Sequence, residues 1–287
     1  MANLRTELLE YFKEYKPEFF YFVDDVFLAR PVEEIMEFCD MYEEFSLPFW
    51  FNTRSETCEQ ETLARLKEVG CYRVSYGIEC GNEEFRQKIL RRKTTNEELI
   101  RRFRTIAEAG IAFSLNVIIG MPGETRELVM DTVRLIKSIS GFDALTVSIF
   151  SPYHGTVLRE VAVQNGWLEP GSITRHTTAS SVLKMPPPYL NSNEIDGLAA
   201  TFPLYCAFPK EEWARIRRAE ISDEEGLKIR EEYASVYRSE FLGENQDDIE
   251  RLMVQGANGC RTNPKDAFRV SPKHLSKEQL ESLQVAT

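Results

Sequence analysis

Five short runs rich in β-branched and aromatic residues recur along the first half of the chain, at 19–23, 49–53, 72–78, 113–119 and 145–150. Between them, apolar residues recur three and four positions apart, as an amphipathic helix requires. Apolar strands that alternate with helices are typical of a parallel sheet in an α/β fold. The spacing fits the roughly 30 residues of one unit of a (β/α) barrel. A doubly wound open sheet would give the same pattern.

Capping residues and glycines indicate where the predicted helices begin and end. Thr95 is followed three residues later by Glu98, which predicts a capping box at the start of a helix. Gly70 and Gly110 come where two helical patterns stop, and we expect both to adopt a positive φ there. The alternation of strands and helices therefore has matching start and stop signals.

The chain opens with a helical pattern over 5–15, in which Leu8, Leu9 and Phe12 are expected to point inward. In a (β/α) barrel a helix in this position follows a strand, and no strand precedes it here. Two interpretations remain open. Either a free helix precedes the sheet, or the first βα unit lacks its strand.

The alternation ends near residue 152, and the remaining patterns are mainly helical. The last stretch, 256–287, is polar and contains Gly and Pro, so we expect it to be loosely ordered. We therefore expect two parts, a partial (β/α) barrel over 1–157 and a helical region with a polar tail over 158–287.

The composition narrows the functional classes. Hydrophobic residues make up 43% and charged residues 28% of the 287 residues, as in folded soluble proteins. The net charge of −11 opposes binding to a nucleic-acid backbone, so we expect no nucleic-acid partner. No apolar run is long enough for a membrane span, and the charged N-terminus does not resemble a secretion signal. We expect a cytoplasmic protein with a small-molecule substrate.

The cysteines do not predict a metal site. There are six cysteines and three histidines, no CxxC pair is present, and no two histidines are close in sequence. A tetrahedral zinc site usually takes ligands in closely spaced pairs. We therefore predict no metal-ligating residue from the sequence.

Polar or glycine-rich segments follow all five expected strands. In parallel α/β folds, ligands bind at the carboxyl ends of the strands. Each segment also has a plain structural explanation, such as helix capping for Asp24 and Asp25, a salt bridge for Glu79, or a simple turn for the Gly-Met-Pro-Gly stretch at 120–123. Five such segments together favour a ligand-binding site at the carboxyl ends of the strands. These residues do not by themselves identify a catalytic group.

The segments VDDVF, TRSE, GIECG, LRRKTTNEE, NVIIGMPGET and SPYHGT occur in this order over residues 19–157. Together they resemble the core of radical S-adenosylmethionine (radical SAM) enzymes, most closely the subgroup that often carries a cobalamin-binding domain. The resemblance implies a partial (β/α) barrel that binds S-adenosylmethionine across its strand ends. It also implies a [4Fe–4S] cluster and hydrogen abstraction from a substrate, with cobalamin-linked methyl transfer or cyclisation as candidate reactions.

Several cofactor-binding roles follow from the resemblance alone. Asp24 and Asp25 match the segment that approaches the amino group of S-adenosylmethionine. Glu79 matches an acid that hydrogen-bonds the ribose hydroxyls. Arg92, or its neighbour Arg91, matches a basic residue that faces the methionine carboxylate.

The remaining matched positions lie later in the chain or beside the cavity. Arg54 is placed where it could add a charge to the cavity. The segment along the adenine is matched by Asn116, Gly120 and Pro122, and the segment near the substrate by Ser151, Tyr153 and Gly155.

The chain departs from the family in one respect. The CxxxCxxC loop that ligates the cluster is absent, and in the family it follows the first barrel strand, which this pattern also lacks. We therefore expect the N-terminal portion to be missing or to be supplied by a partner subunit, and the chain alone to be inactive. A non-catalytic subunit that binds S-adenosylmethionine, or an unrelated α/β binding domain, are the alternatives.

Overall fold

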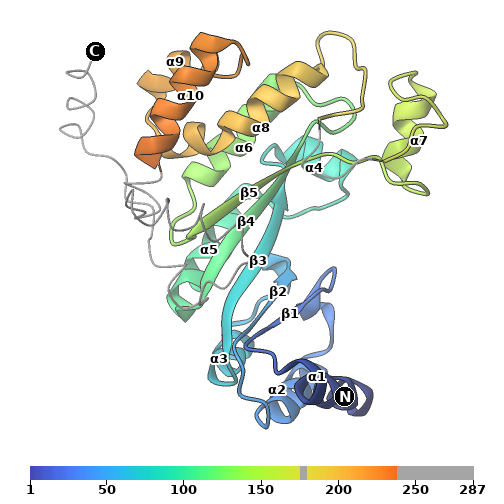
Figure 1. Cartoon of the computed structure of the whole chain (residues 1–287), viewed down its shortest axis with the longest axis vertical. Coiled ribbons are helices and arrows are strands. Elements are labelled where there is room, and N and C mark those ends of the chain that lie inside the picture. The colour runs from blue at the N-terminus through green and yellow to red at the C-terminus, as the bar shows by residue number, and fades with distance from the viewer. Residues whose placement is uncertain (175–179, 238–287) are drawn as a thin grey trace. The chain divides into compact units, whose positions relative to one another are not determined.

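One parallel sheet organises the chain in the computed structural model, which describes residues 1–174 and 180–237 (Figure 1). The sheet order is β1-β2-β3-β4-β5, which is also the order along the chain. The strands are β1 Phe20–Phe22, β2 Phe49–Thr53, β3 Cys71–Glu79, β4 Ala112–Ile119 and β5 Ala144–Ile149. All five expected strands are confirmed, and the connectivity is that of a partial (β/α) barrel.

Helices alternate with the strands in the first part of the chain, and the described residues after β5 form helices without further strands. Those of the alternating part are α1 Ala2–Tyr15, α2 Val32–Tyr42, α3 Gln60–Glu68, α4 Glu83–Ile89, α5 Asn96–Ala109, α6 Arg126–Lys137 and α7 Val157–Gln164. Those of the C-terminal region are α8 Ser192–Ala207, α9 Trp213–Arg218 and α10 Glu224–Val236. Short 3-10 turns lie at Phe27–Ala29, Ser55–Thr57 and Lys210–Glu212. The expected helical C-terminal region is confirmed, whereas its polar tail, 256–287, lies outside the described residues.

The chain divides into two compact units. Unit 1 comprises Met1–Ile78, Lys93–Asn116 and Ile139–Thr146. Unit 2 comprises Glu79–Arg92, Val117–Ser138 and the described residues from Val147 onward. The division interleaves along the chain because β4 and β5 each contribute their first residues to unit 1 and their last to unit 2.

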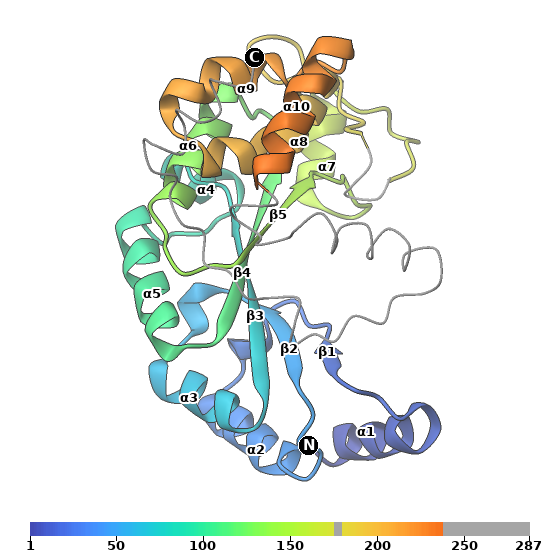
Figure 2. The ribbon, with the colours of Figure 1, turned by 60° about the vertical axis from the view of Figure 1, so that its left-hand side comes forward.

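Aromatic packing forms the core of unit 1. Phe22, Phe38, Tyr42 and Phe49 form a cluster with ring centroids 4.7–5.9 Å apart. Helices α2, α3 and α5 lie along the same side of the strands (Figure 2). Edge-to-face and offset ring contacts of this kind stabilise a core beyond the burial of their area.

The opening helix is only partly as expected. Leu8 is buried, and the Phe12 ring lies 5.2 Å from Phe45. Leu9 is 42% exposed, so the expectation that it points inward is wrong. Residues 8 and 12 are one helical turn apart and share a narrow stripe, whereas residue 9 is rotated away from it by about 100°.

The predicted helix boundaries are present. Thr95 caps α5 by accepting a hydrogen bond from the backbone N–H of Glu98 at 3.2 Å. The Glu98 carboxylate accepts from Arg102, so it is the cap rather than the full reciprocal box that is observed. Gly70 and Gly110 both have positive φ, at 108° and 69°.

Unit 2 is built on α6, α8, α9 and α10. Arg126 of α6 forms a two-pronged ion pair with Glu220 at 2.5 and 2.7 Å, and Tyr205 of α8 donates to the same carboxylate. The Lys137 ammonium donates to two carbonyl groups at the end of α8. Among the helices of 1–174 and 180–237, none is both long and apolar enough to cross a bilayer.

Candidate functional site

Most of the sequence-predicted residues lie at or just beyond the ends of strands, whereas Asn116 lies inside β4 and Arg92 follows α4. They fall into two groups, one in each unit. Asp24, Asp25, Arg54 and Asn116 belong to unit 1. The group in unit 2 comprises Glu79, Arg92, Gly120, Pro122, Ser151, Tyr153 and Gly155. The contacts of each group are described within its own unit.

The loop after β1 holds the first of these residues. The Asp24 carboxylate accepts from Arg30 at 2.5 Å and from the backbone N–H of Val26 at 3.4 Å, so it closes its own loop. Asp25 is exposed. Asp24 thus closes its own loop but caps neither the 3-10 turn at Phe27–Ala29 nor α2, so the helix-capping explanation is wrong. Asp25 is accessible to a ligand.

The end of β2 places Arg54 at the surface. Its side chain is exposed, and its carbonyl group accepts from the backbone N–H and the hydroxyl of Thr57. The guanidinium is therefore accessible, while the backbone is fixed by the turn at Ser55–Thr57.

A polar row crosses one face of the sheet in unit 1. Asn52 donates to the Tyr21 hydroxyl at 2.5 Å and pairs in register with Ser75, whose hydroxyl lies 2.7 Å from that of Ser114. Asn116 follows Ser114 by two residues, so alternation along β4 puts it on the same face. This face is not continuously apolar, because it carries these polar groups together with the stacked rings of Tyr21 and Trp50.

In unit 2 the end of β3 brings Glu79 and Arg92 together. The Arg92 guanidinium lies 3.7 Å from the Glu79 carboxylate, and the Arg92 side chain is 9% exposed, against 25% for Glu79. Arg91 is exposed. Of the two candidate arginines, Arg92 is therefore the one that contacts Glu79.

The backbone at these positions is strained. Glu79 has φ 65° and Arg91 has φ 54°, in the left-handed region that side chains with a Cβ rarely adopt. Such a conformation costs on the order of 1–3 kcal/mol and persists only where the surroundings enforce it, often at ligand-binding positions. Glu79 adopts this conformation although it is not a glycine, so its backbone strain singles it out at the end of β3.

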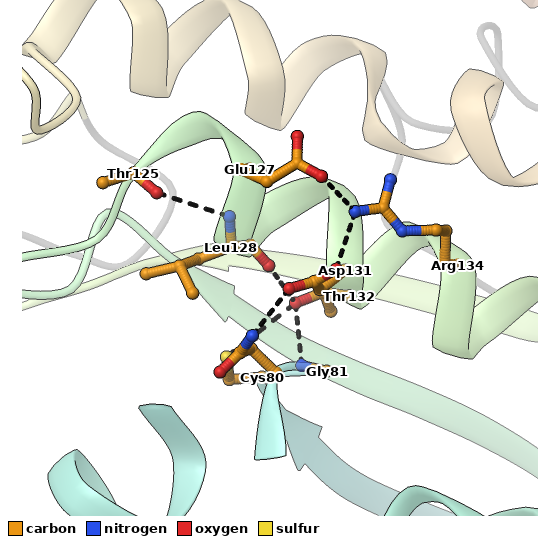
Figure 3. Close-up of polar contacts among 9 residues, drawn as sticks. Cys80, Gly81, Thr125, Glu127, Leu128, Asp131, Thr132 and Arg134 are labelled. Atoms are coloured by element: carbon orange, nitrogen blue, oxygen red, sulfur yellow. Dashed lines mark hydrogen bonds and ion pairs between the residues drawn. The ribbon is translucent and has the colours of Figure 1, made fainter. Parts of the chain in front are cut away.

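Helix α6 holds the chain just beyond Glu79 (Figure 3). The Gly81 backbone N–H donates to the Thr132 hydroxyl at 2.8 Å, and the Asn82 side chain donates to Asp131 at 2.7 Å. A Cβ on Gly81 would lie 2.4 Å from the Thr132 Cα, so only glycine permits this approach. Glu79 is thus positioned by a rigid contact two residues away.

The turn after β4 is closed by a buried carboxylate. Glu124 accepts from the backbone N–H groups of Gly120 at 2.6 Å and Met121 at 3.2 Å. Its other oxygen, Oε1, is buried and has no hydrogen-bond partner among the described residues. Burial raises the pKa of Glu124 to about 8, although the two N–H groups oppose this shift. The carboxyl group therefore binds a proton readily at neutral pH.

Gly120 itself has φ 80°, and a Cβ there would lie 2.9 Å from the Ile195 side chain. Pro122 is buried in the same turn. The turn predicted from the sequence is therefore a tight one, fixed from one side by α8 and from the other by Glu124.

The loop after β5 carries the substrate-side residues of the prediction. Ser151 is half-buried, and Tyr153 and Gly155 are exposed. The Tyr153 backbone N–H donates to Ser151, and the Tyr153 carbonyl group accepts from Thr156. The loop is therefore ordered by its own hydrogen bonds and leaves the Tyr153 ring accessible.

The cysteines do not fit an iron–sulfur cluster. Burial raises the pKa of the Cys39 and Cys80 thiols to about 11 and that of Cys58 to about 12, and it raises the pKa of Cys71 and Cys206 further. Cluster ligands are thiolates, which such burial opposes. Within 1–174 and 180–237, no group of three His, Cys, Asp or Glu side chains is placed to hold a metal ion. The sequence contains no CxxxCxxC motif, and Cys260 lies outside the described residues.

The first half of the chain is similar to a known protein family. The family model of the Radical SAM superfamily matches residues 3–136. Residues 3–136 are a radical SAM core. The matched region covers β1 to β4 and α6, and it therefore contains Glu79, Arg92 and the Glu124 turn.

Two curated relatives are similar to parts of this chain. An uncharacterised methyltransferase of Pyrococcus horikoshii is 28% identical over 165 residues, which cover 57% of this chain and 36% of that protein. A tRNA-2-methylthio-N(6)-dimethylallyladenosine synthase of Chromohalobacter salexigens is 38% identical over 81 residues, which cover 28% of this chain and 18% of that protein. The chain thus spans about a third of the first relative and less of the second.

A solved structure shows the fold over a longer range. The cobalamin-dependent S-adenosylmethionine radical enzyme OxsB matches 98% of this chain and 48% of its own, with a TM-score of 0.50 and 11% identity. This similarity supports the arrangement of elements in the radical SAM core and the helices after it.

Two residues of this region were not predicted from the sequence. Glu124 stands in the stretch GMPGET, and its place four residues after Gly120 could have suggested a carboxylate that closes the turn. Arg159 is buried beside the loop after β5, where a helical pattern gave no sign of it. Both act on backbone groups, which sequence patterns do not show.

Glu124 makes stability depend on pH in a defined direction. Its pKa rises from 4.5 in the unfolded chain to about 8 in the folded one, so the folded state holds more protons between these values. The contribution of Glu124 to the free energy of unfolding is therefore fully present below pH 4.5 and is lost as the pH rises to about 8.

We expect Glu124→Gln, which cannot titrate, to lose this part of the pH dependence. Urea unfolding of the wild type and the variant at several pH values measures the difference. Glu127→Gln, at an exposed position of the same segment, is the control and should follow the wild type. Parallel curves for the wild type and Glu124→Gln would contradict the raised pKa.

Proposed function

We propose that this chain supplies the S-adenosylmethionine-binding strand ends of a radical SAM enzyme. The observation that carries the proposal is the strained backbone of Glu79 beside its ion pair with Arg92. A carboxylate accepts from the ribose hydroxyls, and a guanidinium donates to a ligand carboxylate, so the pair matches two groups of one ligand.

The other matched residues are assigned roles in the same proposal. Asp25 and Asp24 approach the amino group, Asn116, Gly120 and Pro122 lie along the adenine, and Arg54 adds a positive charge. The substrate side is formed by Ser151, Tyr153 and Gly155. Within unit 2, Gly120 and Pro122 follow β4, and the loop at 151–155 follows β5, which supports this part of the set.

A [4Fe–4S] cluster supplies the electron that cleaves S-adenosylmethionine in enzymes of this family, and this chain's residues do not fit one. We therefore assign no reaction step to the chain alone and propose that the cluster ligands come from another segment or a partner subunit. In their absence the chain is a cofactor-binding subunit without radical chemistry of its own.

Methyl transfer to a small molecule is the reaction class we propose, with cobalamin as a further cofactor and a cytoplasmic location. The name of the Pyrococcus horikoshii relative supports methyl transfer. The net charge of −11 opposes an RNA substrate, whereas the similarity to a tRNA-modifying enzyme favours one. We give the charge more weight because the tRNA enzyme matches only 28% of this chain.

Glu79→Gln is expected to weaken S-adenosylmethionine binding by about tenfold to a hundredfold. A hydrogen bond to a charged group is worth about 1.5–3 kcal/mol, and the amide keeps the size of the side chain but loses the charge. Calorimetric titration of the purified chain with S-adenosylmethionine measures the dissociation constant.

Glu84→Gln is the matched control, because Glu84 is an exposed glutamate of the same unit that pairs with Lys88. It should bind as the wild type does. Equal affinities of the wild type and Glu79→Gln would overturn the assignment of Glu79. Micromolar tRNA binding at 150 mM salt would overturn the small-molecule substrate.

Anaerobic reconstitution with iron and sulfide is expected to leave the chain without a stoichiometric cluster and unable to cleave S-adenosylmethionine. The reason is that burial raises the pKa of Cys39, Cys58 and Cys80, and that no group of three possible ligands within 1–174 and 180–237 is placed to hold a metal ion. Visible absorption, iron content and liquid chromatography of 5′-deoxyadenosine give the result. A full cluster with cofactor cleavage would show that the chain is active alone.

A further inference from the structure

Arg159 is an unusual residue in unit 2 because it is a buried charge whose partners are all carbonyl groups. It is 5% exposed, and its guanidinium donates to Pro152 at 2.8 Å, Pro170 at 2.9 Å and Ser172 at 2.8 Å. No carboxylate is among its partners in the described part of the chain. Burying an arginine without a counter-ion costs free energy, which the three carbonyl groups must offset.

The three carbonyl groups belong to two separate loops. Pro152 lies in the loop after β5, whereas Pro170 and Ser172 lie in the loop after α7. The Thr174 hydroxyl also donates to the Pro152 carbonyl group, at 3.1 Å. A guanidinium is planar and presents several donors in fixed directions, so one side chain can join both loops.

This joint brings together the backbones beside two residues whose apolar side chains are exposed. Tyr153 directly follows Pro152, and Ile173 stands between Ser172 and Thr174, both of which share the joint. Tyr153 is 53% exposed and Ile173 is 84% exposed. Large apolar side chains that are held at the surface by a buried network are available to a ligand.

We propose that Arg159 is a positioning residue that joins the two loops, so that Tyr153 and Ile173 form one apolar surface on the substrate side. This inference rests on the proposed function, in which Tyr153 faces the substrate. It adds a substrate class, namely a molecule with an aromatic or aliphatic group that packs on this surface. Arg159 acts through the loops and does not itself contact the reacting atoms.

Arg159→Lys tests the joint directly. A lysine keeps the charge but has all its donors on one nitrogen, whereas one guanidinium nitrogen of Arg159 reaches Pro152 and the other reaches Pro170 and Ser172, so a lysine cannot hold both loops in this geometry. Hydrogen exchange should become at least tenfold faster in both loops, 151–156 and 169–174, while the amides of α6 stay protected. Arg134→Lys, at a more exposed arginine of α6, is the control and should leave both loops unchanged.

The shared surface is tested with indole as the probe. Tyr153→Ser and Ile173→Ser should each weaken indole binding at least threefold, and the double variant should lose less than the product of the two. In the Arg159→Lys background the two effects should become independent. The measurement uses nuclear magnetic resonance titration of the full chain.

Three outcomes would overturn the inference: unchanged exchange in Arg159→Lys, independent effects in the wild-type background, or no indole binding by the wild type. Titration with S-adenosylmethionine separates these from a failure of the proposed function. If Arg159→Lys keeps its cofactor affinity while the loops loosen, the joint acts on the substrate side alone. A chain that never binds the cofactor refutes the proposed function and leaves the joint between the loops intact.

Discussion

The end of β3 is the constraint on which the rest of the candidate site depends. Glu79 takes a left-handed backbone conformation there, and the contact of Gly81 and Asn82 with α6 holds the chain in place beyond it. The Arg92 guanidinium can then lie 3.7 Å from the Glu79 carboxylate. A free loop would relax to an unstrained conformation, so the fixed contact with α6 is what makes the strained position available for binding.

The turn after β4 and the loop after β5 are held in a similar way. In each, a side chain buried nearby satisfies backbone groups, namely Glu124 for two N–H groups and Arg159 for three carbonyl groups. The segments that follow these two strands are thus ordered by buried side chains that satisfy their backbone groups. Such support fixes the position of the residues proposed for binding.

Much of this could be predicted from the sequence, because strands, helix ends and capping residues depend on local patterns. The five strands, the Thr95 cap and the turn at Gly120 are confirmed for that reason. The expectation that Leu9 points inward was wrong because α1 buries only a narrow stripe, from which residue 9 is rotated away. The choice of Arg92 over Arg91 in the contact with Glu79, and the roles of Glu124 and Arg159, depend on how distant backbone groups meet, which a single sequence does not show.

The most direct measurement of the central claim compares Glu79→Gly with Glu79→Ala. Both remove the carboxylate, but only glycine relieves the left-handed conformation, so Glu79→Gly should be about 1 kcal/mol more stable to urea than Glu79→Ala. Both should bind S-adenosylmethionine at least tenfold more weakly than the wild type, and equally so. If Glu79→Ala matched the wild type in affinity, or the two variants were equally stable, the strained carboxylate would not be the cofactor-binding group described.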